Sequence, residues 1–595
     1  MADAQAADFE SRYTALRENE AELSDSARLH ALFELDHEYN MANYPEWATW
    51  EGRYERNGEW TDNSSTAQRI RDAEMEWSME VIRSIDREDL PDSEQLNYDL
   101  YRKQIERSLE SRSSPDRYII ITQLGGRHQS VPRLFEVMPK RSVKDYEDIL
   151  SRMRGLPRVI SNDIATLQRG RILGITPPQV TLRDVPDQIA AILNDDPTGS
   201  PLFEPFVKMP QNIPAAEQER IREEATRLYR DSIAPAFRSL HTFLVNTYIP
   251  AARTTIGYTL LPDGEKWYSF RVEGYTTTTL LPETIFEIGQ TEVGRIRGEM
   301  ERVVAESGFE GTLEEFEDFL RNDPQFYYDD AEELLRGYRD ICKRADPELS
   351  RLFGTLPRLP YGVTPIPDFM APSQTTAYYV SGSNETGRPG YFFANTWNLA
   401  SRPTWEMEPL ALHEAVPGHH LQISLANELE GLPRWRRDAG YTAFVEGWGL
   451  YAESLGEEMG FYTTPYTKYG QLSYQMWRAV RLVVDVGIHQ RGWTRQQAID
   501  FFDQNSGKPL HDIEVEIDRY IVWPGQALAY KIGEMKIIEL RDYARDALGE
   551  KFDIREFHDQ LLLQGALPLD ILERNIREWV GERNSKFKIQ NEGEQ

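Results

Sequence analysis

Apolar residues recur every three to four positions through most of this 595-residue chain, and charged residues lie between them. This spacing places the apolar side chains on one face of an α-helix, so it restricts the chain to a fold in which long helices pack against each other. It predicts helices over residues 4–39, 66–109, 144–168, 215–248, 281–307, 312–321 and 329–344, and again over 409–430, 442–459 and 471–490.

The pattern changes between residues 356 and 404. This segment is rich in proline, glycine and aromatic residues, and it contains β-favouring runs at 376–380 and 391–395. We therefore expect a mainly α fold with a small β-sheet. A loose boundary near residue 350 would separate a helical lobe (1–350) from a second lobe (351–595), and we expect the two to be parts of one catalytic unit rather than independent domains.

The composition narrows the possible partners. The chain is 40% hydrophobic and 28% charged, which is typical of a globular protein, and its formal net charge is −31. Such an acidic surface argues against nucleic acid or an anionic membrane as a partner. No apolar run approaches the roughly 18 residues of a membrane span. The first ten residues do not resemble a signal peptide, so we expect a cytoplasmic protein or an exported one whose leader has been removed.

Cys342 is the only cysteine. An intrachain disulfide and a cysteine-based zinc site are therefore both excluded. Any transition metal must be held by histidine and carboxylate side chains, and Cys342, which lies in a predicted helix, is expected to be a packing residue.

Three of the ten histidines fall within eight residues, in the segment His413-Glu414-Ala415-Val416-Pro417-Gly418-His419-His420. In many zinc hydrolases a histidine followed by glutamate, with a second histidine close behind, binds the metal, and the glutamate accepts the proton of the attacking water. The segment therefore predicts a site for one Zn²⁺ ion. The alternative is that these are ordinary helix residues.

The spacing is unusual for such a site. Two histidines four residues apart lie on one helix face, but His419 and His420 follow His413 by six and seven residues. On an unbroken helix neither could share an ion with His413. Pro417 and Gly418 favour a break in the helix, and a bulge there would return a later histidine to the metal. We prefer His419 as the second ligand and leave His420 as the alternative.

A third ligand is expected from a following helix. Glu446 is the best candidate, in a segment where Gly447 and Gly449 flank Trp448. Glycine weakens a helix, so its presence here suggests close packing against another backbone. Glu453 lies seven residues later on the same face and could hold the ring N–H of a ligand histidine. The alternative for both glutamates is a solvated helix surface.

The segments around residues 413–422 and 446–453 resemble a bacterial family catalogued as domain of unknown function 885. The likeness extends over most of the chain, and it is also strong at residues 388–396 and 519–531. The active-site pattern of that family is similar to the gluzincin metallopeptidases, whose third zinc ligand is a glutamate on a following helix. The resemblance implies a zincin-like catalytic lobe and a helical lobe that together enclose a cleft.

The same resemblance suggests roles for residues outside the metal segment. Tyr391–Asn395 would be an edge strand that hydrogen-bonds an extended peptide, with Arg388 beside it; the alternative is a core strand. Tyr530 could donate to the oxyanion formed when water attacks a carbonyl, a role that His420 could also fill. Either Arg519 or Lys531 could meet a substrate carboxylate, and Gln526 lies in the same motif.

One further cluster comes from the apolar helix predicted at 471–490. Arg478, Arg481, Asp485 and His489 share a stripe on it. A buried network of ion pairs is the favoured interpretation, and a substrate-carboxylate site or a catalytic histidine is the alternative.

Together these features predict a zinc-dependent hydrolase, most plausibly a metallopeptidase for short peptides. His413, His419 and Glu446 would hold the ion, and Glu414 would act as general base. Two alternatives stay open. One is a metal-dependent hydrolase of another amide or ester, and the other is a peptide-binding protein with a degenerate site.

Overall fold

The computed structural model describes residues 2–367, 371, 374–384 and 387–593. Contacts within the chain divide it into two compact units. Unit 1 comprises residues 1–255 and 260–262, and unit 2 comprises residues 256–259 and 263–595. The division therefore lies well before residue 350, because helices between 264 and 353 pack with the segments that follow them.

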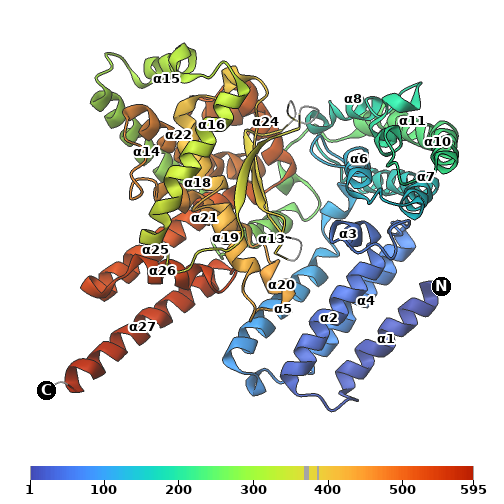
Figure 1. Cartoon of the computed structure of the whole chain (residues 1–595), viewed down its shortest axis with the longest axis horizontal. Coiled ribbons are helices and arrows are strands. Elements are labelled where there is room, and N and C mark those ends of the chain that lie inside the picture. The colour runs from blue at the N-terminus through green and yellow to red at the C-terminus, as the bar shows by residue number, and fades with distance from the viewer. Residues whose placement is uncertain (1, 368–370, 372–373, 385–386, 594–595) are drawn as a thin grey trace. The chain divides into compact units, whose positions relative to one another are not determined.

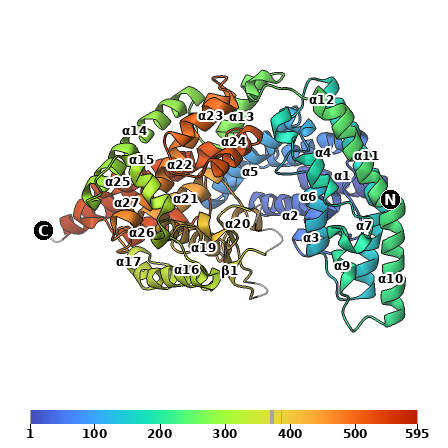
Figure 2. The same cartoon turned by 90° about the horizontal axis from the view of Figure 1, so that it is seen from above.

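Unit 1 is helical. Its α-helices are α1 (Ala2–Glu18), α2 (Asp25–Asn43), α3 (Pro45–Trp50), α4 (Ser65–Arg83), α5 (Asp92–Ser111), α6 (Arg127–Val137), α7 (Val143–Ile172), α8 (Val185–Ala190), α9 (Glu204–Val207), α10 (Ala215–Leu228), α11 (Ala234–Phe243) and α12 (Ile249–Ala251). Helices α1, α2, α4 and α5 run side by side (Figure 1). Two π-helical turns, Tyr229–Ile233 and Leu244–Tyr248, join α10, α11 and α12 into one line (Figure 2).

Unit 2 holds most of the residues that the sequence singles out. Its α-helices are α13 (Gly264–Thr276), α14 (Pro282–Ser307), α15 (Leu313–Asn322), α16 (Ala331–Ala345), α17 (Leu349–Leu352), α18 (Met407–Glu414), α19 (His419–Asn427), α20 (Arg434–Arg437), α21 (Thr442–Ser454), α22 (Pro465–His489), α23 (Arg495–Asp503), α24 (Leu510–Val522), α25 (Ala529–Leu548), α26 (Ile554–Leu562) and α27 (Leu569–Gly593). No helix in the described part of the chain is both long and apolar enough to cross a bilayer.

A three-stranded sheet lies in unit 2, beside α16 (Figure 2). Its strands are β1 (Tyr361–Pro365), β2 (Ala377–Val380) and β3 (Gly390–Ala394), in the order β1-β3-β2. Strand β3 is parallel to β1 and antiparallel to β2. The expectation of a mainly α fold with a small sheet is thus confirmed, although the sequence pattern did not reveal β1.

A strand does form where one was predicted at 391–395, but the prediction that it lies at the edge of the sheet is wrong. Both edges of β3 are already hydrogen-bonded, to β1 on one side and to β2 on the other, so β3 is the central strand. An extended peptide could add only to the outer edge of β1 or β2.

The core of unit 2 is built on two helix pairs. Helix α14 packs along α22, and α21 packs along α25 (Figure 1). Nearly every residue of α22 from Tyr469 to His489 is buried. The α21–α25 pair is unusually close because Gly447 and Gly533 face each other: a Cβ at Gly533 would lie 1.8 Å from the carbonyl oxygen of Ala443 and 2.9 Å from Cα of Gly447.

We expect Gly533→Ala to lower the free energy of unfolding by about 1–3 kcal/mol, because the added methyl must push α21 and α25 apart. Thermal and denaturant unfolding will measure this loss. Gly298→Ala is the matched control: it also lies within a helix, but its Cβ would meet nothing within 4 Å, so it should stabilise the helix by up to about 1 kcal/mol. Equal unfolding midpoints for the two variants would contradict the tight contact.

Candidate metal centre

The helix predicted over 409–430 is broken in the middle. Helix α18 ends at Glu414, residues Ala415–Gly418 form a turn that contains a cis Val416–Pro417 peptide, and α19 begins at His419. A Cβ at Gly418 would lie only 1.9 Å from the carbonyl oxygen of His413. The backbone can therefore fold back this closely only with glycine at this position.

The turn brings His419 to His413, and Glu446 of α21 completes the group. The Nε2 atoms of His413 and His419 each lie 3.6 Å from Oε2 of Glu446. One ligand atom from each of the three residues lies within 4.8 Å of the others. Two ligands of a tetrahedral zinc, each about 2 Å from the ion, are roughly 3.3 Å apart. The donor set, two imidazole nitrogens and a carboxylate oxygen, fits such an ion.

Helix α21 is held against the turn by two contacts. The indole N–H of Trp448 donates to the carbonyl oxygen of Pro417 at 2.9 Å. A Cβ at Gly449 would lie 2.6–2.9 Å from the ring atoms of His413, so the bare glycine leaves room for the imidazole. The two glycines that flank Trp448 thus serve different contacts, one with α25 and one with His413.

Glu453 lies behind His413. It is fully buried, and its Oε1 accepts a hydrogen bond from Nδ1 of His413 at 2.8 Å. With Nδ1 as the donor to Glu453, Nε2 faces Glu446 and is the nitrogen that could bind a metal once it has lost its own proton. Arg478 lies 3.6 Å from the same carboxylate oxygen and offsets part of its buried charge.

The charges within the group are strongly coupled. Burial alone would lower the pKa of His413, but its hydrogen bonds to Glu446 and Glu453 raise that pKa to about 9. Burial would raise the pKa of Glu446, yet the contacts with His413 and His419 hold it well below its usual value. The carboxylate is thus stabilised in its ionised form, which is the form that binds a cation.

His420 does not join this group. Its Nε2 donates to the carbonyl oxygen of Leu359 at 3.1 Å, and its Nδ1 lies 2.9 Å from the hydroxyl of Tyr379 and 3.3 Å from that of Ser424. Burial lowers the pKa of His420 to about 4, so the ring is neutral. Because both ring nitrogens of His420 are hydrogen-bonded to residues next to the sheet, neither is available to bind a metal or to donate to an oxyanion.

Glu414, the last residue of α18, is 9% exposed. Within the described part of the chain its carboxylate accepts no hydrogen bond, whereas the neighbouring His413 is bonded on its Nδ1 side. A buried carboxylate that has no hydrogen-bond donor among the described residues and lies next to a ligand candidate is available to accept a proton from a bound molecule.

The residues of the 519–531 motif separate into two groups. Tyr530 is 8% exposed, and its hydroxyl accepts a hydrogen bond from Nη2 of Arg519, which also donates to Gln526. Lys531 instead is 2% exposed and donates to Gln475 and Glu534 at 2.7 Å each. Of the two cations expected to meet a substrate carboxylate, Lys531 is thus buried among its partners, whereas the side chain of Arg519 is 17% exposed.

On α22, the contacts of Asp485 and His489 are different from those of Arg478 and Arg481. Asp485 accepts from the hydroxyl of Tyr268 at 2.7 Å and from the backbone N–H of Gly525 at 3.0 Å. His489 bridges two backbone segments, accepting from Tyr258 N–H and donating to the carbonyl of Tyr520. Both residues hold neighbouring backbone segments in place through hydrogen bonds to neutral groups, and not through the ion pairs that the sequence interpretation favoured.

The residues at the sheet have structural surroundings. Asn395 is 1% exposed, and its amide donates to the backbone carbonyls of Ala371, Gln374 and Thr375. Tyr391 is half-buried within β3, and Arg388 is exposed before it. None of the three lies in the group of His413, His419 and Glu446.

Trp477, Glu516 and Tyr520 were not singled out from the sequence, yet they surround the arginines of α22. Oε2 of Glu516 lies 3.2 Å from Arg481, and the Tyr520 hydroxyl accepts from Arg481 and from the Trp477 indole. Glu516 lies three residues before Arg519, a spacing typical of a helix ion pair, and this was the available signal.

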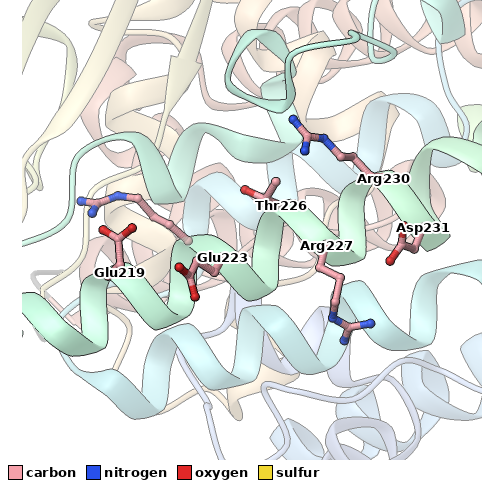
Figure 3. Close-up of a pocket in the computed structure, with 7 residues that line it drawn as sticks. Glu219, Glu223, Thr226, Arg227, Arg230 and Asp231 are labelled. Carbon is pink, nitrogen blue, oxygen red and sulfur yellow. The ribbon is translucent and has the colours of Figure 1, made fainter.

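A surface pocket is present in unit 1, along α10 and the π-turn that follows (Figure 3). Charged side chains dominate its lining, which consists of Glu219, Arg222, Glu223, Thr226, Arg227, Arg230 and Asp231. It contains none of the metal-site candidates, so the surface hollow and the chemical cluster are separate features.

Comparisons with known proteins agree with the fold. The family described as "Bacterial protein of unknown function (DUF885)" matches residues 45–576. A crystal structure described as "the putative lipoprotein from Colwellia psychrerythraea" is 27% identical, with a TM-score of 0.87 over 94% of this chain and 100% of that one. A second structure, "a putative lipoprotein of unknown function from Shewanella oneidensis", is 16% identical, with a TM-score of 0.67 over 93% and 99% of the two chains. No curated protein matches the sequence.

The buried Asp485 yields a pH prediction. Burial raises the pKa of Asp485 to about 7. A raised pKa favours the protonated folded state, so this contribution to stability is full below about pH 4 and is lost as the pH rises through about 7. We expect Asp485→Asn to remove this dependence, worth up to roughly 4 kcal/mol. The free energy of unfolding of the wild type and of Asp485→Asn, measured at pH 5 and pH 8, tests this expectation. If the two proteins differ in stability by the same amount at both pH values, Asp485 is not the source of the pH dependence.

Proposed function

The chain belongs to the DUF885 family of bacterial proteins of unknown function, and we propose that it is a zinc-dependent hydrolase that cleaves short peptides. The observation that carries the proposal is the convergence of His413, His419 and Glu446, whose ligand atoms lie within 4.8 Å of one another. The supporting contact is the hydrogen bond from His413 to the buried Glu453.

The arrangement is similar to that of the gluzincin peptidases. Two histidines and a catalytic glutamate come from one helical segment, and the third ligand is a glutamate on a following helix. Here the first segment is two helices, α18 and α19, joined by the Pro417–Gly418 turn. We assign His413, His419 and Glu446 as ligands and unit 2 as the catalytic unit.

The roles of the remaining residues follow from their positions. A zinc ion held by His413, His419 and Glu446 would polarise the carbonyl of the scissile bond and would lower the pKa of water. Glu414 accepts the proton of the attacking water and passes it to the leaving nitrogen. Tyr530 lies one turn before Gly533, and Glu446 is adjacent to Gly447, so the two side chains are on neighbouring turns of packed helices. The Tyr530 hydroxyl donates to the carbonyl oxygen as it becomes negative.

The location of the relatives bears on the compartment. The structure from Colwellia psychrerythraea is described as a "putative lipoprotein", and lipoproteins are anchored in the bacterial cell envelope. This supports the exported alternative for the present chain, so that the peptides it cleaves would be met outside the cytoplasm.

The ligand assignment predicts the metal content. The purified protein should contain about one zinc per chain, and His419→Ala or Glu446→Gln should lower that content severalfold or more because each removes a ligand. His511→Ala, on an exposed helix position, is the control and should retain the metal. Elemental analysis of the folded proteins measures this. Wild-type protein without stoichiometric divalent metal would refute the proposal.

The base assignment predicts a separation of metal binding from turnover. Glu414→Gln removes the proton acceptor and no ligand, so it should keep the metal and lose about 10²–10⁴-fold in kcat. Glu457→Gln, at an exposed position, is the control. If Glu414→Gln is as active as the wild type, another group must accept the proton.

A panel of substrates will identify the class of bond that the protein cleaves. Short peptides should be cleaved in preference to non-peptide amides and aryl esters. Preferred cleavage of the latter would identify a different metal hydrolase. Tight binding of peptides without cleavage, with zinc present, would instead indicate a binding protein.

A further inference from the structure

Three guanidinium groups lie beside the candidate metal centre. Arg478 and Arg481 are one turn apart on α22, and Arg519 comes from α24; we call them the arginine cluster. The cluster begins directly behind the first histidine, because Arg478 lies 3.6 Å from the oxygen of Glu453 that is bonded to His413.

The cluster carries more positive than negative charge. Arg481 and Arg519 share one carboxylate, that of Glu516, at 3.2 and 3.4 Å. Among the described residues, the carboxylate paired with Arg478 is that of Glu453, which also holds His413. Guanidinium groups do not lose their proton in proteins. An excess of buried positive charge is costly unless an anion accompanies it.

Several N–H groups of the cluster are unsatisfied. The Nε atoms of Arg478 and Arg519 and the Nη1 atom of Arg481 are buried, and none has a hydrogen-bond partner among the described residues. Most buried polar groups in proteins are hydrogen-bonded, so such a concentration in one place indicates a missing partner. The partner must be an acceptor, and the surplus charge requires it to be an anion.

Aromatic rings fix the orientation of the guanidinium planes. Arg481 lies over the ring of Tyr530, 4.4 Å from its centroid, Arg478 lies 4.9 Å from that of Trp477, and Arg519 lies 5.6 Å from that of Trp523. Rings stacked on the faces leave the N–H edges for hydrogen bonding, which suits the planar fork of a carboxylate.

The cluster is not sealed from the outside. The side chain of Arg519 is 17% exposed, Trp477 and Gln526 are half-buried, and Trp523 is 42% exposed. The Tyr530 hydroxyl accepts from Arg519, and its own proton has no acceptor among the described residues. It can therefore donate to a bound molecule.

We propose that the arginine cluster binds a carboxylate of the substrate, with Arg481 and Arg519 as its main partners. The substrates are then peptides that carry a free carboxylate close to the cleaved bond. This specificity rests on the proposed hydrolase function. The carboxylate could be the C-terminus of the peptide or an acidic side chain, since both offer the same two oxygens.

The test compares one peptide in three forms: with a free C-terminal acid, with a C-terminal amide, and as the amide with an added glutamate side chain. With the zinc-loaded protein, kcat/KM should be about 10–100-fold higher for the free acid than for the plain amide. Cleavage of the glutamate-containing amide at a similar rate would identify a side-chain carboxylate as the ligand.

Variants of the cluster should abolish this preference. In Arg481→Met and Arg519→Met the ratio of acid to amide should fall towards one. Arg491→Met is the matched control, an arginine just beyond α22 that pairs with Glu283, and should keep the ratio. Melting curves exclude unfolded variants, and Arg481→Lys should restore part of the preference if charge is what matters.

Binding to the Glu414→Gln protein separates this proposal from the hydrolase proposal. Calorimetry with the acid and amide peptides measures carboxylate recognition without turnover. If the wild type cleaves nothing but the acid still binds more tightly, the hydrolase function fails and the carboxylate site stands. Equal binding and equal cleavage of acid and plain amide, or the same loss for both in Arg481→Met, would overturn the carboxylate site.

Discussion

The close approach of Gly418 to the carbonyl oxygen of His413 is the contact on which the candidate centre depends. A Cβ there would be 1.9 Å from that oxygen, so the chain can turn this tightly within the four residues Ala415–Gly418 only with glycine at this position. Without this turn, His419 would lie on another face of a continuous helix, away from His413. The donor atoms therefore come together because of the path of the backbone, and the side-chain types alone would not bring them together.

Glycine contacts extend this constraint across unit 2. Gly449 makes room for the His413 ring, and Gly447 and Gly533 allow α21 and α25 to meet at backbone distance. Together they fix how far Glu446 reaches towards the histidines. A helix is destabilised by glycine in its interior, so these contacts must recover that cost through the packing they permit.

Local spacing predicted much of this arrangement and missed what depends on distant partners. The helices, the break at Pro417–Gly418 and the position of Glu446 are signalled by residues close in sequence. The central place of β3 follows from pairing with β1, a short strand without a clear pattern, and could not be seen locally. His420 satisfies its ring nitrogens with Leu359 and Tyr379, far along the chain, so its packing role was equally hidden. The division between the two compact units, around residues 255–263, also depends on distant partners, since α14 packs along α22.

The hydrogen bond from Trp448 to the carbonyl of Pro417 bears on how this centre could be transplanted. A designer who copied only the three donor residues onto another helical scaffold would obtain side chains without the register that aligns them. The unit to be copied is the Ala415–Gly418 turn together with Trp448, whose hydrogen bond to Pro417 holds α21 against that turn. A change in that indole would therefore shift Glu446 relative to the two histidines, although the indole is not one of the three donors.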